Sequence, residues 1–413
     1  MAFPLQDVTV PELKELCQAM WDWKLCGNCQ QDIKERSCPP RRCSGVDNCP
    51  WGQRSERLGP FFDFYRGVTG SYVPDFFGEE DQALRGHRDL FDIIRLTRRC
   101  GFTVLRTLCM HQYFATRLGD VDSQTMVPES DQGRAFDLAA RVLTMTNLDS
   151  ADSQGFLNQT GGGDEEGIGF SPPAVRGSIA CLQIALAEIF PSRIHPSLQA
   201  GDPQATVIKN GLTAEMLRRV AGIRIERTDN LRDHLRLDST AGVVQVFHLT
   251  SVLREHLLAT KPTGSDEDSS YETLPCLPRE LALETLYTIQ LIFPPGGNSQ
   301  AMLRTLVSKQ GFDPDSLRFG TALFELSRHE RERALCFPVW GTRLMDLYDE
   351  IENPKPRGRL DVWLERRSKS RHIMLATAVG IFTAVILGLL SLCVSIFQTW
   401  IAWQEWKESA AGR

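Results

Sequence analysis

The sequence predicts a mainly α-helical protein: a helical soluble region with a small winged-helix-like unit, followed by one C-terminal transmembrane helix. Three observations support this fold class. First, a long run near the C-terminus has no charged or amide side chain. Second, most other segments carry apolar residues at helical spacing. Third, apolar and polar residues alternate in one stretch, as they do in the strands of a hairpin. The helical spacing predicts packing around a shared core.

The apolar run extends from Ile373 to Phe397 and is long enough to cross ~30 Å of hydrocarbon as a helix. Tryptophans follow it and basic residues precede it: Trp400, Trp403, Trp406, and Arg366, Arg367, Lys369, Arg371. Indole rings favour the headgroup layer, and short flanks rich in Lys and Arg stay on the cytoplasmic side. We therefore expect residues 372–400 to span a membrane once, with the N-terminal region in the cytosol and a short tail, 401–413, beyond the span.

Composition narrows the classes of partner. The chain has 413 residues, of which 42% are hydrophobic and 24% charged, so wholesale disorder is not expected. Its net charge of -6 argues against a nucleic-acid binder, and the basic cluster before the span favours the lipid bilayer instead. The first twenty residues lack a basic region followed by an apolar run, so no secretory signal peptide is predicted.

Changes of composition predict the organisation of the chain. The expected segments are a cysteine-rich segment (1–59), part of a helical bundle (60–148), a Gly-rich acidic loop (149–175), a helical region with the winged-helix-like unit (176–260), an acidic Pro-containing linker (261–278) and a juxtamembrane helical region (279–371). Helices are expected at 10–24, 84–99, 102–118, 131–147, 176–190, 213–221, 279–293, 298–310, 341–352 and 359–371. The aromatic-rich stretch 60–78 is expected to be irregular, because glycines and Pro74 interrupt it.

The stretch that follows position 222 predicts the winged-helix-like unit. It reads as a short strand, a helix starting near Asp229, a hairpin with Ser239–Gly242 at its turn, and a helix over Thr250–Thr260. Phe247 occupies an inward position of the second hairpin strand. Units of this shape serve as protein–protein modules in other proteins, so the analogy points to protein contacts on the basis of shape alone.

Four short sequences in this half of the chain carry a resemblance to other proteins. They are LRDHLRLD (231–238), FHLTSVLREHL (247–257), ENPKPRG (352–358) and WLERRS (363–368), followed by the single span. In this combination, over roughly residues 129–406, the chain resembles a large group of uncharacterised filamentous-fungal proteins. The resemblance implies a helical soluble part with a terminal membrane anchor, and it implies no activity, because none is established for the group.

Six cysteines lie between Cys17 and Cys49, in a segment too rich in proline and glycine to form a large apolar core. In a reducing cytosol such cysteines favour metal thiolates over disulfides. The predicted ligands of a single structural zinc are the C-x₂-C pair Cys26 and Cys29, closed by Cys38 and Cys43, with Cys17 and Cys49 as alternates. Free cysteines in a Pro-rich loop are the competing interpretation.

No motif in the chain predicts catalysis. Neither G-x-S-x-G nor H-E-x-x-H occurs, and His234, His248 and His256, which share one predicted unit, are expected to be structural. The sequence favours a non-enzymatic scaffold or adaptor that recruits protein partners. The alternative is an accessory protein or enzyme that acts on an apolar metabolite at the membrane face, for example in fungal secondary metabolism. An apolar pocket with convergent polar groups would favour this alternative.

Overall fold

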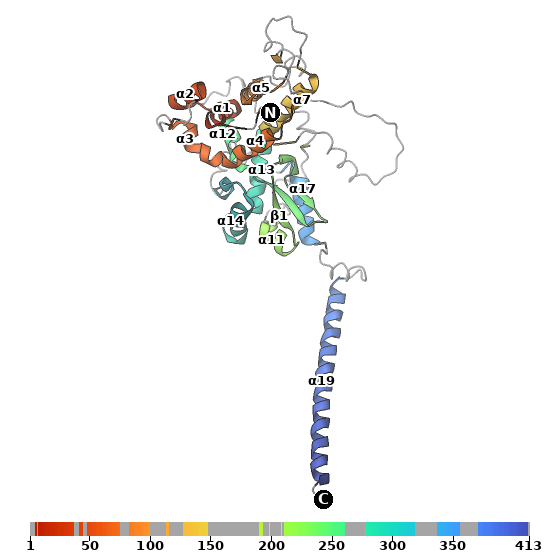
Figure 1. The fold of residues 1–413 in the computed structure, drawn as a ribbon. Coiled ribbons are helices and arrows are strands. Elements are labelled where there is room, and N and C mark those ends of the chain that lie inside the picture. Colours follow the sequence, from red (N-terminus) through yellow and green to blue (C-terminus); the bar gives the residue numbers. More distant parts are fainter. Residues whose placement is uncertain are drawn as a thin grey trace. The chain divides into compact units, whose positions relative to one another are not determined.

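A computed structural model describes most of the predicted elements (Figure 1). The described residues are 7–36, 41–43, 48–74, 82–99, 127–147, 210–260, 277–318, 337–355 and 371–411, together with 5, 113–114, 190–192, 198 and 208. The chain forms two units, Met1–Asn353 and Pro354–Arg413. The first contains the cysteine-rich segment, the helices and the sheet, and the second contains the apolar C-terminal helix.

Short helices build the N-terminal part of the first unit. In chain order they are α1 (Val10–Trp21), α2 (Gly27–Glu35), α3 (Pro50–Arg54), the 3-10 helix η2 (Ser55–Leu58) and α4 (Gly59–Gly70). Helix α1 confirms the helix expected at 10–24, with Pro11 in its first turn, and its apolar face packs on α2, α5 and α12. The cysteine-rich segment therefore contributes Leu13, Leu16 and Trp21 to the same core as the sheet region.

Helix α4 contradicts the prediction that residues 60–78 are irregular. The segment is helical from Gly59 to Gly70, and Pro60 stands at the helix start, where a missing N–H costs nothing. Phe61, Tyr65 and Val68 recur at helical spacing and are buried. Their burial outweighs the low helix propensity of the glycines, which were the basis of the wrong prediction.

Helices α5 (His87–Arg99) and α7 (Glu129–Thr144) confirm the helices expected at 84–99 and 131–147. Both pack together, and α7 also contacts α4. Asp131 is fully buried in the first turn of α7, where its carboxylate accepts hydrogen bonds from the Tyr72 hydroxyl (2.8 Å) and the Ala83 backbone N–H (2.7 Å). This carboxylate joins three separate segments.

The sheet has three strands, β1 (Arg224–Thr228), β2 (Arg236–Asp238) and β3 (Val243–Phe247), in the order β1-β3-β2. The predicted hairpin is confirmed: β2 and β3 are antiparallel, and the turn between them lies at residues 239–242. Strand β1 pairs in parallel with β3, with Thr228 opposite Phe247. Phe247 is fully buried, as its predicted inward position requires.

The helix expected near Asp229 is instead the short 3-10 helix η5 (Leu231–Asp233). Asn230 caps it by accepting the Arg232 N–H through its side chain (3.2 Å). His234 then returns to an extended conformation and Leu235 has a positive φ of 59°. The segment is too short for an α-helix because it must turn at once into β2.

The remaining elements of the first unit are α11 (Ala214–Arg219), α12 (Thr250–Ala259), α13 (Arg279–Ile292), α14 (Gly297–Gln310), the 3-10 helix η6 (Pro314–Arg318) and α17 (Gly341–Glu352). They confirm the helices expected at 213–221, 279–293, 298–310 and 341–352, and the helix of the hairpin unit. The Thr213 hydroxyl caps α11 by accepting the Met216 N–H (3.3 Å). The predicted fold class, mainly α with a hairpin-containing unit and one C-terminal apolar helix, is confirmed.

The second unit is dominated by one long helix, α19 (Arg371–Ala411), drawn in blue in Figure 1. Its stretch Thr377–Lys407 is long and apolar enough to cross a membrane, and no part of that stretch is buried in the protein. The helix continues to Ala411, and so includes most of the segment 401–413 that was expected to be a short tail beyond the span. Five predictions fall wholly or mostly outside the described residues: the helices at 102–118, 176–190 and 359–371, the loop 149–175 and the linker 261–278.

Candidate metal centre

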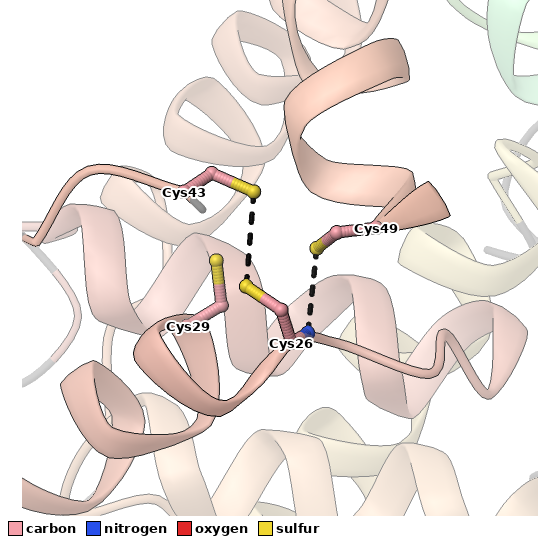
Figure 2. Close-up of side chains that lie close together, drawn as sticks. All are labelled: Cys26, Cys29, Cys43 and Cys49. Atoms are coloured by element: carbon pink, nitrogen blue, oxygen red, sulfur yellow. Dashed lines mark hydrogen bonds between the residues drawn. The ribbon is translucent and has the colours of Figure 1, made fainter. Parts of the chain in front are cut away.

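Four cysteine side chains from three parts of the N-terminal segment converge on one point (Figure 2). Cys26 and Cys29 belong to the start of α2, Cys43 lies in the extended chain beyond it, and Cys49 precedes α3. Three of the four are buried and Cys43 is partly exposed. The four sulfur atoms lie within 4.8 Å of one another.

The spacing of the sulfurs suits a metal better than a disulfide. Four sulfurs bound at ~2.3 Å to a tetrahedral ion lie ~3.8 Å apart along each edge. The Cys26 and Cys43 sulfurs are 3.8 Å apart. A disulfide requires ~2.05 Å, so this pair would have to move together by more than an ångström to form one. The arrangement matches a closed four-sulfur site, which is the structural rather than the catalytic type.

Helix starts position three of the four sulfurs. Cys26 is the N-cap of α2, Cys29 is in the first turn of the same helix, and Cys49 is the N-cap of α3, directly before Pro50. The Cys26 backbone N–H donates to the Cys49 sulfur at 3.4 Å. Helix N-termini carry partial positive charge and unpaired N–H groups, both of which favour the thiolate form that binds metal.

A buried ion pair holds the surrounding chain in place. Lys14 on α1 donates to Asp32 on α2 at 2.6 Å, and both side chains are almost fully buried. The other oxygen of Asp32 accepts the Arg41 backbone N–H at 3.0 Å, two residues before Cys43. Asp32 therefore fixes both α2 and the extended segment that brings Cys43 to the cluster. The Lys14 charge also acts to lower the pKa of Cys29.

Without a cation, the Cys29 thiol resists ionisation. Burial raises the pKa of Cys29, a hydrogen bond with Cys26 that favours the protonated Cys29 thiol raises it further, and Cys43 and Cys49 add to the rise because neighbouring thiolates would repel one another. A divalent cation would supply the charge that four clustered thiolates need. Cys17 is also buried, with a pKa raised by burial, but it does not belong to this group.

The structure brings together three of the four predicted ligands, Cys26, Cys29 and Cys43. The fourth sulfur of the described cluster is Cys49, which the sequence analysis named as an alternate, whereas Cys38 lies outside the described residues. Proline favours the first position of a helix, and Pro50 accordingly places Cys49 at the N-cap of α3. This signal does not separate Cys49 from Cys38 in the sequence, because Cys38 also directly precedes a proline.

The three histidines of the sheet region each hydrogen-bond to a protein group. His234 is fully buried, pairs with the Thr288 hydroxyl (2.7 Å) and accepts the Phe247 N–H (3.1 Å). Burial holds the pKa of His234 well below its usual value, so the ring stays neutral. His256 pairs with the Leu277 carbonyl (2.8 Å), and burial lowers its pKa to about 4. His248 pairs with Asp229 at 2.5 Å.

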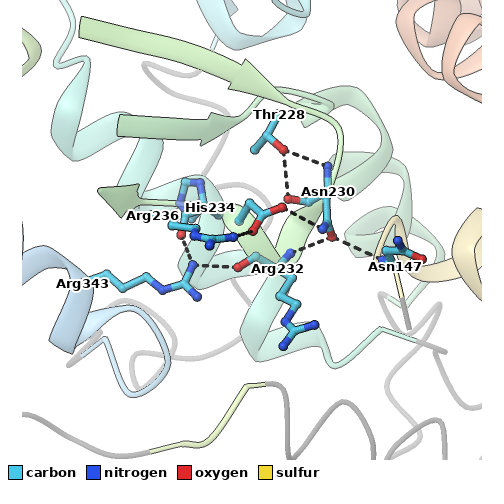
Figure 3. Close-up of polar contacts among 8 residues, drawn as sticks. Asn147, Thr228, Asn230, Arg232, His234, Arg236 and Arg343 are labelled. Carbon is cyan, nitrogen blue, oxygen red and sulfur yellow. Dashed lines mark hydrogen bonds and ion pairs between the residues drawn. The ribbon is translucent and has the colours of Figure 1, made fainter. Parts of the chain in front are cut away.

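Half of the LRDHLRLD segment takes part in one polar network, through Arg232, Asp233, His234 and Arg236 (Figure 3). Asn230 bonds to Asp233 (2.8 Å) and to the Asn147 backbone N–H (3.3 Å), and Asp233 pairs with Arg236. Arg343 of α17 donates to the Arg232 carbonyl at 2.7 Å and to the His234 carbonyl. The network ties α7 and α17 to the sheet, so this segment is structural.

No protein-family model, curated protein or solved structure matches this chain. The resemblance to filamentous-fungal membrane proteins therefore stays a prediction from the four short sequences.

Proposed function

We propose that this protein is a membrane-anchored, non-enzymatic scaffold or adaptor whose helical region faces the cytosol and binds protein partners. One observation carries the proposal: α19 exposes apolar side chains around its whole circumference from Thr377 to Lys407. Exposure of an apolar surface of that extent is unfavourable in water but favourable in the hydrocarbon core of a bilayer. Because α19 has 41 residues and rises ~1.5 Å per residue, it is about twice as long as the bilayer core is thick.

The charges at the two ends support the orientation. Four basic residues precede the apolar stretch, whereas beyond it Lys407 and Arg413 are offset by Glu405 and Glu408. Trp400 and Trp403 support a headgroup contact near the far end, and the Lys407 ammonium lies 5.1 Å from the Trp403 ring centre. This pair of a cation and an indole suits the membrane–water boundary.

Membrane extraction and protease protection test the anchor. The full chain should resist carbonate extraction from microsomes, and added protease should destroy an N-terminal epitope while sparing a C-terminal one. Leu389→Arg places a charge mid-span and should release much of the protein, whereas Trp406→Arg at the boundary should not. Carbonate-soluble wild type, or a protected N-terminus, contradicts the proposed topology.

We also propose that Cys26, Cys29, Cys43 and Cys49 bind one structural zinc ion that stabilises the N-terminal segment. The closeness of the four sulfurs, with the Cys26–Cys43 distance equal to a tetrahedral edge, and the places of three of them at helix starts support this assignment. Such a site is saturated by protein ligands and leaves no position for a substrate, in keeping with a scaffold.

Metal analysis of the full chain tests the zinc site and its fourth ligand. The wild-type protein should contain about one zinc per chain. Cys49→Ser should lose it, and Cys38→Ser should retain it, with Cys393→Ser in α19 as a control for the loss of an unrelated cysteine. Wild-type protein that contains no zinc after purification with zinc present would reject the site. Loss of zinc in Cys38→Ser and its retention in Cys49→Ser would show that Cys38, not Cys49, is the fourth ligand.

A further inference from the structure

The parallel pair of strands creates a second place where polar side chains gather. Thr228 of β1 stands opposite Phe247 of β3, so the next residues, Asp229 and His248, leave the sheet at the same edge. This is the carboxyl edge of the two strands. In sheets with parallel strands, ligands bind outside this edge, where loops diverge and helices begin.

A groove of about 540 Å³ lies at this edge, a size that suits a small organic molecule. Its apolar walls come from α4, through Phe64 and Val68, and from α14 with the segment after it, through Val307 and Phe312. Asp229, His248, Arg141 and Arg227 add polar groups. The groove thus combines an apolar surface with a few convergent charged side chains.

The charged side chains that line this groove differ in whether they have a hydrogen-bond or ion-pair partner. Asp63 pairs with Arg66 (2.8 Å), Asp229 pairs with His248, and Arg227 donates to the Gly311 carbonyl (3.2 Å). The Arg141 guanidinium makes no hydrogen bond or ion pair with any residue that the structure describes. Arg141 also lines an adjoining hollow of about 330 Å³, so it stands between two open spaces.

His248 supplies a second unsatisfied group. Its side chain is 3% exposed and lines the groove, with its Nε2 committed to Asp229. Its Nδ1 is buried and has no hydrogen-bond partner in the described part of the chain. A buried polar atom without a partner destabilises the folded protein, so a purely structural role leaves this atom unexplained.

We propose that this groove binds a small organic anion, with a carboxylate or phosphate held by Arg141 and Arg227 and an apolar body against Phe64 and Phe312. Guanidinium groups bind both kinds of anion through paired hydrogen bonds. The site goes beyond the anchor and scaffold roles and does not depend on them, because it belongs wholly to the first unit. It supplies the pocket that the alternative function, work on an apolar metabolite, requires.

Four water-soluble probes test the chemistry of the ligand. Titrations use the full chain in phosphatidylcholine nanodiscs, with 3-phenylpropionate, phenyl phosphate, the neutral 3-phenylpropan-1-ol and inorganic phosphate. At least one of the two aromatic anions should bind about tenfold more tightly than the alcohol and than inorganic phosphate. An aromatic anion can contact the arginines and the apolar wall together, whereas each of the other two probes can contact only one of them. The ratio between the two aromatic anions distinguishes a carboxylate from a phosphate site.

Paired variants locate the binding. Arg141→Gln should weaken binding of the preferred anion about tenfold and leave binding of the alcohol unchanged. Arg219→Gln, at an exposed ion pair on α11, should change neither affinity. Gly67 lines the groove in mid-helix with open space where a side chain would begin. Gly67→Leu should therefore fill the groove and abolish binding, and Gly70→Leu at the end of the same helix should not.

Three results would overturn the proposal. They are no measurable binding of either aromatic anion at 10 mM (roughly the weakest affinity of interest), equal affinity for 3-phenylpropan-1-ol and the anions, or unchanged anion affinity in both Arg141→Gln and Gly67→Leu. Circular dichroism of each variant establishes that it is folded. Because Gly67→Leu also raises helix propensity, loss of binding in that variant is not expected to result from unfolding.

Discussion

The cysteine-rich segment and the sheet region bury polar groups in opposite charge states. In the first, Lys14 and Asp32 are buried as a close ion pair beside a cluster of thiols. In the second, burial keeps His234 neutral and raises the pKa of Glu284. The first segment buries a charged pair among its apolar residues, whereas in the second burial holds His234 and Glu284 toward their neutral forms. Four changes test this contrast.

The largest effect is expected from a charge placed in the sheet region. Phe247→Asp should destabilise the first unit by on the order of 5 kcal/mol or more, because it puts a carboxylate in place of a fully buried apolar side chain. Urea unfolding followed by circular dichroism measures the loss. Gln245→Asp on the same strand is partly exposed and lies in register between Arg236 of β2 and Glu226 of β1, so it should cost far less than Phe247→Asp. A stable Phe247→Asp variant would mean that the strand register is wrong.

Breaking the buried ion pair should have the next largest effect. Lys14→Met leaves the Asp32 carboxylate buried without its cation and should cost about 3–5 kcal/mol. The double variant Lys14→Met with Asp32→Leu should recover part of that loss. Arg66→Met, which removes half of an exposed pair with Asp63, should cost less than about 1 kcal/mol. Equal costs for the buried and exposed pairs would remove the contrast between the regions.

Glu284 makes the stability of the sheet region depend on pH. Its carboxyl accepts the Val339 and Trp340 backbone N–H groups (2.9 and 2.6 Å), yet burial raises its pKa from 4.5 to about 7. The folded protein therefore binds a proton more tightly than the unfolded chain. This contribution is fully present below pH 4.5 and is lost as pH rises through 7, by on the order of 2–3 kcal/mol.

Unfolding free energies measured between pH 4.5 and 8 test this expectation. Glu284→Gln keeps an oxygen that accepts both N–H groups but cannot ionise, so its stability should vary less with pH. Glu280→Gln on the same helix removes an exposed charge that adds, less than burial does, to the raised pKa of Glu284, so it should reduce the slope only slightly. A Glu284→Gln slope identical to that of the wild type would show that this carboxyl does not titrate in the folded protein.

The smallest effects on stability are expected at a feature that the two regions share, a threonine at the start of a helix. Thr213 caps α11 in the sheet region, and Thr9 begins α1 by donating its N–H and hydroxyl to Glu12 (2.7 and 2.8 Å). Thr213→Ala and Thr9→Ala should each cost about 1 kcal/mol. Thermal melts of the two variants measure both. A much larger loss at one site would show that its threonine does more than cap a helix.

Local patterns in the sequence determined the elements that depend on neighbouring residues. Periodic apolar positions predicted α1, α7, α13 and α17, and the turn at Ser239–Gly242 predicted the hairpin. Hydrogen bonds within a helix or between adjacent strands join residues close in sequence, so propensity and spacing are sufficient to predict them. The C-x₂-C pair Cys26 and Cys29 was predictable for the same reason, since one helix start positions both sulfurs.

Only the tertiary structure decided the features that join distant segments. Aromatic burial made α4 helical despite its glycines, and the parallel pairing of β1 with β3 brought Asp229 beside His248. Cys43 reaches Cys26 and Cys29 because Asp32, paired with Lys14, accepts the backbone N–H of Arg41. Each of these features depends on contacts between residues that are far apart in the sequence. Local spacing does not determine which of several such contacts forms, because that depends on how much surface each contact buries.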